Sequence, residues 1–147
     1  AHPPAIDACI ARVVESGSHY RIDRMETLYS PDQSILFVSG EGRVERVPRA
    51  AMMAEFAVRG AAGDPPLSTE HRVLHVEQQG DQATALLYRR MNPATPPALY
   101  ELRLRKHAGG WQVAGETVVA FPRAEDADDF LPPRTWPQGA RAQAWRS

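Results

Sequence analysis

Two titratable side chains, His71 and Glu116, are the best candidates for acid–base chemistry in this sequence. His71 lies in a segment with strand-like spacing, and an imidazole exchanges protons near neutral pH. Glu116 lies in the last apolar segment before the C-terminal tail, where a carboxylate could act as a general base. The alternative for both residues is a solvated or structural side chain without a catalytic role.

His71 and His75 also have the spacing of a metal-binding pair on a helix. On a strand, however, four residues span roughly 13 Å, so the two rings cannot bind one ion. Cys9 is the only cysteine, and its place on an apolar helix face predicts packing rather than nucleophilic chemistry. We therefore expect neither a metal site nor a cofactor.

A second group of residues could line a pocket for a hydrophobic small molecule. Buried tyrosine hydroxyls need hydrogen-bond partners, so a tyrosine cluster could orient a polar group of a ligand. The candidate ligand-binding residues are Tyr20, Phe37, Met53, Phe56, Tyr88, Tyr100 and Trp111. Such a lining suits an aromatic or terpenoid-like ligand better than a sugar or a phosphate. The same side chains could instead serve only to complete the core.

Charge and spacing argue against nucleic-acid, nucleotide and membrane partners. The 147 residues include 17 basic and 18 acidic ones, a net charge of -1, which predicts no strong attraction to nucleic acid or anionic lipid. Gly40 and Gly42 have turn spacing, without the Lys-Ser or Lys-Thr of a phosphate loop. Arg89 and Arg90 could contribute to a basic stripe, but the interleaved Glu101 favours a solvated or dimer-facing surface. No apolar run approaches the roughly 20 residues that span a bilayer.

Helices and a hairpin that could position these side chains are predicted in the first half of the chain. Ile6, Ile10 and Val13 belong to an apolar stripe with helical spacing, preceded by prolines and followed by Gly17. A glycine turn separates two short apolar segments, which indicates a hairpin. The predicted elements are helices over 5–17 and 21–29, strands over 34–38 and 43–47, and a helix from Pro48 to Gly60.

The second half of the chain has the pattern of consecutive strands. Tyr100, Leu102 and Leu104 alternate with charged residues, as they do when one face of a strand is buried. The predicted strands cover residues 68–78, 82–91, 98–107 and 111–120. We therefore expect an α+β fold in which three helices and a small hairpin pack on a curved antiparallel sheet around a pocket.

The composition changes after Phe121. We expect one domain over residues 1–121 and a tail over 122–147 that is rich in proline and acidic residues and contains tryptophan. Phe130, Leu131, Trp136 and Trp145 are expected to pack on the domain or on a partner chain. A single cysteine allows no intrachain disulfide, so a reducing cytoplasm is the expected compartment. A mature exported form is the alternative, because a cleaved leader would leave no trace.

The order of these elements resembles the cone-shaped fold of the nuclear transport factor two-like superfamily. The matching segments are Leu28-Tyr29-Ser30-Pro31-Asp32, Gly80-Asp81-Gln82-Ala83 and Gly110-Trp111-Gln112-Val113. Within that superfamily the chain looks like the uncharacterised bacterial branch labelled lumazine-binding or SnoaL-like, polyketide-cyclase-like. The resemblance covers about residues 5–121.

This resemblance implies a pocket between the helices and the concave sheet face, and a homodimer formed through the convex sheet face. It also implies that the steroid-isomerase reaction is absent. The general-base aspartate of those members falls on Phe37, which cannot accept a proton. The residue sets of the dehydratase-like and epoxide-hydrolase-like members have no match in this sequence.

Three functions follow as hypotheses. The first is a homodimeric small-molecule-binding domain without a cofactor. The second is a cofactor-independent isomerase, cyclase or dehydratase, in which His71 or Glu116 acts as the base and Tyr20 or Tyr100 donates to a developing oxyanion. The third is an assembly module. An enzyme predicts a cavity holding a titratable group with a perturbed pKa, whereas an assembly module predicts a filled interior and a large apolar outer surface.

Overall fold

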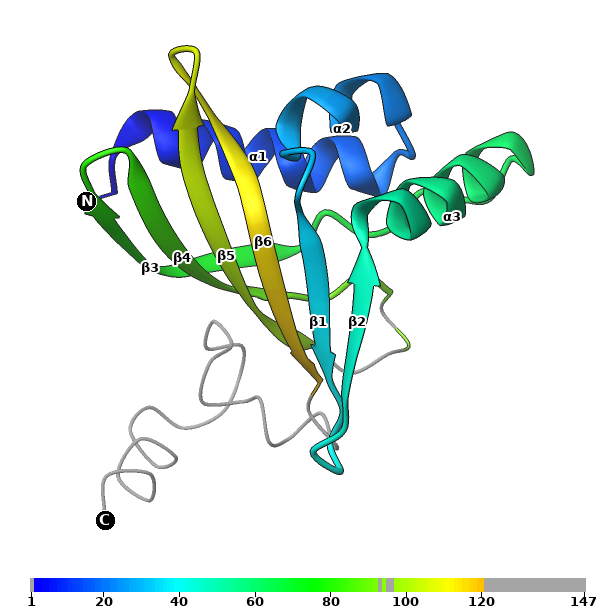
Figure 1. Ribbon diagram of the computed structural model, residues 1–147. Coiled ribbons are helices and arrows are strands. Elements are labelled where there is room, and N and C mark those ends of the chain that lie inside the picture. The colour runs from blue at the N-terminus through cyan, green and yellow to red at the C-terminus, as the bar shows by residue number, and fades with distance from the viewer. Residues whose placement is uncertain (1, 93, 95–96, 121–147) are drawn as a thin grey trace.

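The computed structural model describes residues 2–92, 94 and 97–120, which form three helices packed on a six-stranded sheet (Figure 1). The helices are α1 (Pro4–Ser18), α2 (Ile22–Leu28) and α3 (Arg49–Ala61). The strands are β1 (Ser34–Val38), β2 (Val44–Pro48), β3 (His71–Gln79), β4 (Gln82–Arg89), β5 (Ala98–His107) and β6 (Gly110–Ala120). The predicted α+β fold is confirmed. The predicted tail over 122–147 lies outside the described residues.

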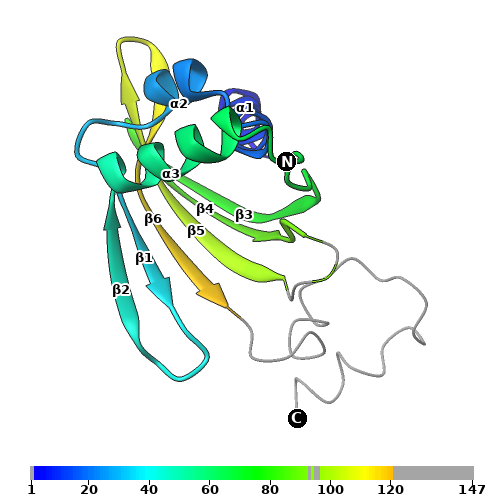
Figure 2. The same cartoon turned by 90° about the vertical axis from the view of Figure 1, so that its right-hand side faces the viewer.

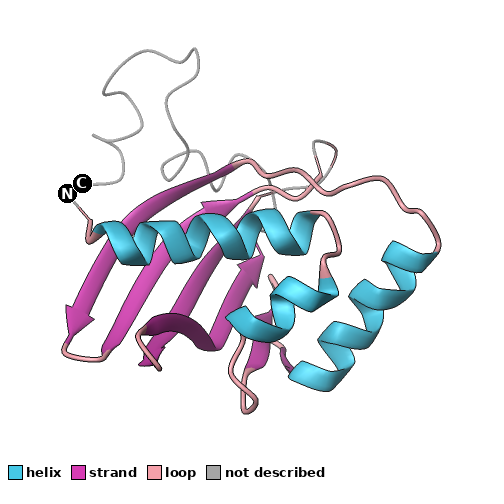
Figure 3. Ribbon diagram, turned by 90° about the horizontal axis from the view of Figure 1, so that it is seen from above, coloured by secondary structure: helices cyan, strands magenta, loops and turns pink. Residues whose placement is uncertain are grey.

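Helix α1 forms because its apolar residues all fall on one side. Ile6, Cys9, Ile10 and Val13 recur every three or four residues, and all four are buried. A proline at the first position suits the start of the helix, since it has no N–H that would lack a partner. After the helix ends, Tyr20 adopts a φ of 56°, and the chain turns into α2. Figure 3 shows α1 lying across the strands, with α2 and α3 beside it.

The sheet has the strand order β2-β1-β6-β5-β4-β3 and is mixed rather than wholly antiparallel. The exception is the pair of β1 and β6, which is parallel, with Ile35 opposite Glu116 and Phe37 opposite Val118. All other neighbours in the sheet pair antiparallel. The N-terminal hairpin is thus part of the main sheet. Hydrophobic periodicity could not predict this pairing, because it carries no information about which distant segments become neighbours.

The sheet bends around the side that carries the helices (Figure 2). Two register shifts, between Val73 and His75 and between Arg103 and Leu104, interrupt the ladders, and bulges of this kind bend the bulged strand. The concave face therefore holds the core, where Ala85, Leu102 and Val113 are buried. None of the helices in the described part of the chain is long and apolar enough to span a membrane.

Candidate functional site

A cavity of ≈ 200 Å³ lies between α1, α3 and the concave face of the sheet. Most of the side chains that line it are apolar, among them Val13, Ile35, Leu102 and Val118. Gly17 on α1 also lines the cavity, and a β-carbon placed on it would find no neighbouring heavy atom within 4 Å. The absence of a side chain at residue 17 therefore helps to keep the space open.

The strands bring four polar side chains to this otherwise apolar cavity: Tyr29, Arg89, Tyr100 and Glu116. Alternate residues of a strand face the same side, so Glu116 and Val118 both point inward from β6. In the neighbouring ladder, Leu102 on β5 lies opposite Glu116. Arg89 is the last residue of β4, at the end of the inward-facing side of that strand.

Glu116 is a buried carboxyl group, with 5% of its surface exposed. The side-chain amide of Gln33 donates a hydrogen bond of 3.0 Å to its Oε1. Burial raises the pKa of Glu116 from 4.5 to about 7, while Arg89, the Gln33 hydrogen bond and Arg103 partly oppose this rise. Near neutral pH the group can therefore either accept or supply a proton.

Arg89 places a buried positive charge in the same cavity, with 7% of its surface exposed. Its Nη2 donates hydrogen bonds to the Ser18 hydroxyl at 2.6 Å and to the Ser68 carbonyl at 3.3 Å. Its buried Nε has no hydrogen-bond partner. The guanidinium is thus fixed between the end of α1 and the segment before β3, by partners that carry no charge.

Two tyrosines complete the polar part of the cavity. Burial raises the pKa of Tyr100 to about 12, and burial followed by the nearby charge of Glu116 raises the pKa of Tyr29 well above its ordinary value. Both hydroxyls therefore stay protonated and can donate hydrogen bonds at any physiological pH. The Tyr100 hydroxyl contacts the Met91 sulfur at 3.7 Å, a weak acceptor that a ligand oxygen could replace.

Four of the residues singled out in the sequence line the cavity: Phe37, Phe56, Tyr100 and Glu116. Tyr20 lies in an adjoining hollow, where its hydroxyl donates to the Pro65 carbonyl at 2.9 Å. The Tyr20 ring packs against Phe56 at 6.0 Å between centroids.

The other sequence candidates do not line the cavity. Tyr88 follows Leu87 and precedes Arg89, so it points to the opposite side of β4, where its hydroxyl donates to Glu70 at 2.7 Å. Trp111 and Met53 are buried in other parts of the core. The ring of His71 lies 2.7 Å from the Thr69 carbonyl, at the start of β3. His71 and Glu116 therefore do not share one site.

Sequence reasoning missed Arg89, which it assigned to a solvated basic stripe. The structure corrects this assignment. The signal was present in the alternation of β4, where Ala83, Ala85 and Leu87 form the apolar inward phase that Arg89 continues. Tyr29 was quoted in the sequence for another reason, and its cavity position depends on how α2 leads into β1.

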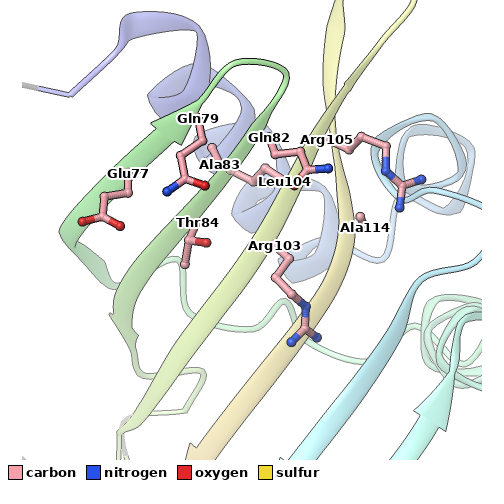
Figure 4. Close-up of a pocket in the computed structure, with 9 residues that line it drawn as sticks. All are labelled: Glu77, Gln79, Gln82, Ala83, Thr84, Arg103, Leu104, Arg105 and Ala114. Carbon is pink, nitrogen blue, oxygen red and sulfur yellow. The ribbon is translucent and has the colours of Figure 1, made fainter.

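An outer groove lies on the opposite side of the sheet, lined by polar side chains such as Glu77, Thr84, Arg103 and Arg105. Figure 4 shows these residues on the face turned away from the helices. Arg103 pairs with Glu101 at 3.2 Å, so part of this surface consists of solvated ion pairs. Within the part of the chain that the structure describes, no cluster of three or more His, Cys, Asp or Glu side chains could hold a metal ion.

Comparison with protein-family models gives no match, and comparison with curated proteins gives none either. Solved structures do resemble the chain. An NTF2-like protein of unknown function from Silicibacter pomeroyi is 18% identical, with a TM-score of 0.65 over 80% of this chain and 93% of that chain. One from Shewanella baltica is 15% identical, with a TM-score of 0.63 over 81% and 93%.

A third similar structure is a cystatin-like-fold domain of unknown function from Nostoc punctiforme. It is 18% identical, with a TM-score of 0.58 over 97% of this chain and 90% of that chain. These similarities show that the chain has the NTF2-like fold, as its sequence resemblance implied. Its assignment to the lumazine-binding or polyketide-cyclase-like branch stays a prediction. A shared fold does not establish a shared function.

Proposed function

We propose that the chain is a small-molecule-binding domain whose ligand is an apolar molecule with one polar end. The observation that carries this proposal is the apolar cavity of ≈ 200 Å³ that contains the buried Arg89 and Glu116. Ligand sites typically combine apolar walls with a few polar groups that fix the orientation of the ligand. An apolar cavity of about 150 Å³ can hold one benzene molecule, so a ligand with one aromatic ring or a short alkyl chain fits the volume.

The variant Gly17→Leu is expected to abolish ligand binding without unfolding the protein. A side chain at residue 17 would extend into the cavity, and leucine is also a better helix former than glycine. The matched control is Ala11→Leu, which adds the same kind of side chain on the exposed side of α1. The probes are 3-phenylpropanoate, octanoate and 3-phenylpropanol, tested by thermal shift and calorimetry.

Wild type and Ala11→Leu should be stabilised by at least one probe, and Gly17→Leu by none. An equal response of Gly17→Leu would place binding outside the cavity. No response of the wild type to any of these probes would count against the proposed function.

A second candidate function is a cofactor-independent isomerase or related enzyme, favoured by the titratable Glu116 inside the cavity. Its carboxylate would take a proton from a carbon beside a carbonyl, and the C–H electron pair would form the enolate. The Tyr100 hydroxyl would donate to the enolate oxygen, and Glu116 would return the proton to carbon. Expected with 2-oxo-3-phenylpropanoate in D₂O is faster exchange of the methylene protons, observed by NMR, in wild type than in Glu116→Gln. Equal exchange rates would exclude this role of Glu116.

The assembly hypothesis has less support, because it predicted a filled interior and an extensive apolar surface. The interior contains the cavity, and the large apolar side chains exposed among the described residues are Phe37, Val44 and Val58. We retain a homodimer through the convex sheet face as a proposal about the partner, which the molecular mass in solution would decide.

A further inference from the structure

Arg89 is a buried cation without a bound counter-ion. It forms no ion pair with a carboxylate of the residues that the structure describes. A guanidinium has five N–H donors, and the two hydrogen bonds to Ser18 and Ser68 leave Nε without an acceptor. An unpaired buried charge strongly destabilises a protein, so such a group is normally found with a partner.

The only described carboxyl group that is buried near Arg89 cannot fully balance this charge. Glu116 influences Arg89 electrostatically without contacting it, and its pKa of about 7 means that a large fraction of the molecules hold it neutral at physiological pH. In those molecules the positive charge of Arg89 remains uncompensated. A ligand that carries an anionic group would remove this imbalance.

We infer that the ligand carries a carboxylate that binds Arg89, with its apolar part among the aliphatic and aromatic walls of the cavity. The inference rests on the proposed function, since it specifies the chemical class of that ligand. A planar guanidinium forms charge-assisted hydrogen bonds with a carboxylate that are about twice as strong as neutral ones. The Ser18 and Ser68 contacts hold the guanidinium in place before the ligand arrives. The hydroxyls of Tyr29 and Tyr100 line the same cavity and offer further donors.

The carboxylate must share the cavity with Glu116, so binding and protonation are coupled. The groups that act on Glu116 are Arg89 on β4, Tyr100 and Arg103 on β5, Tyr29 after α2, and Gln33 before β1. On α3, Glu55 and Arg59 line the same cavity. A second negative charge beside Arg89 disfavours the ionised form of Glu116, so the ligand binds together with a proton above pH 7. The affinity for a carboxylate should then fall by up to tenfold per pH unit above about pH 7.

The test compares 3-phenylpropanoate with 3-phenylpropanamide, which has the same carbon skeleton without the charge. Calorimetry of the wild type at pH 7 is expected to show about tenfold tighter binding of the acid, as for a charge-assisted hydrogen bond. Arg89→Met should lose this preference, Arg89→Lys should keep part of it, and the control Arg105→Met on the outer face should keep all of it. Glu116→Gln should bind the acid with an affinity that does not change between pH 7 and pH 9.

Each outcome of this test bears on one of the two proposals. Equal affinities of the wild type for the acid and the amide would overturn the carboxylate inference and leave the proposed function intact. Binding of neither probe would overturn the proposed function and the inference with it. If Arg89→Met does not fold, the wild-type preference and its pH dependence still decide the question. Proton uptake on binding of the acid at pH 8, measured in buffers of different ionisation enthalpy, would support the inference, and its absence would contradict the coupling to Glu116.

Discussion

Replacing Glu116 by glutamine is expected to raise the free energy of unfolding by about 3 kcal/mol at pH 8 and to leave it almost unchanged at pH 4. In the folded protein, burial raises the pKa of Glu116 from 4.5 to about 7. Each pH unit between these two values corresponds to about 1.4 kcal/mol, which gives the estimate of about 3 kcal/mol.

The sign follows from which state holds the proton. Between pH 4.5 and about 7 the folded protein keeps the Glu116 proton that the unfolded chain has already released. The stability is therefore complete below pH 4.5, declines as the pH rises through this window and is constant above it. Glutamine has no proton to release, so this decline disappears in the variant. It also retains a side-chain oxygen that can accept the Gln33 hydrogen bond of 3.0 Å.

Urea unfolding at pH 4, 6 and 8, followed by tryptophan fluorescence, measures this effect. The control variant is Glu45→Gln, which removes one carboxyl group from an exposed position of β2. Its stability should follow that of the wild type within about 0.5 kcal/mol at each pH, as for most surface substitutions. A similar pH profile of wild type and Glu116→Gln would show that Glu116 is solvated in the protein.

Leu87→Ala is expected to destabilise the protein less than Ile10→Ala, although both side chains are 1% exposed. Ile10 is part of the core cluster and does not line the cavity, whereas Leu87 does. Removing a side chain creates a cost that grows with the number of lost contacts, and a side chain beside an existing cavity has fewer contacts to lose. We expect about 4 kcal/mol for Ile10→Ala and about 2 kcal/mol for Leu87→Ala.

The same urea titrations at one pH compare the two variants. Far-UV circular dichroism should show that both retain the native secondary structure, which is required for the comparison. Because Leu87→Ala enlarges the cavity, it should also accept 4-phenylbutanoate at least as well as the shorter 3-phenylpropanoate. Equal destabilisation by the two substitutions would mean that the space around Leu87 is filled in solution.

The positions of most helices and strands could be predicted from the sequence, because their signals are local. The stripe of Ile6, Ile10 and Val13 predicted α1, and the alternation around Tyr100 and Leu102 predicted β5. The resemblance in element order predicted the NTF2-like fold that similar structures show. The division into a domain over 1–121 and a tail over 122–147 stays a prediction, as does the homodimer.

The candidate site could be predicted only in part. Phe37, Phe56, Tyr100 and Glu116 line the cavity, as their segments suggested, whereas Tyr20, Met53, Tyr88, Trp111 and His71 do not. Tyr88 shows why, since its neighbours Leu87 and Arg89 face the cavity and it must face the other way. A residue type alone does not reveal the face on which a side chain lies.

By itself, therefore, the sequence determined the type and approximate limits of each element, because 3.6-residue and two-residue periodicities are properties of neighbouring residues. Only the tertiary structure decided that β1 pairs in parallel with β6, and that Arg89 and Glu116 meet in one cavity. These arrangements depend on contacts between segments far apart in the chain, whose free energies favour one pairing and one curvature over the alternatives. The raised pKa of Glu116 depends on the same contacts, since burial is a property of the assembled sheet and helices and not of the glutamate.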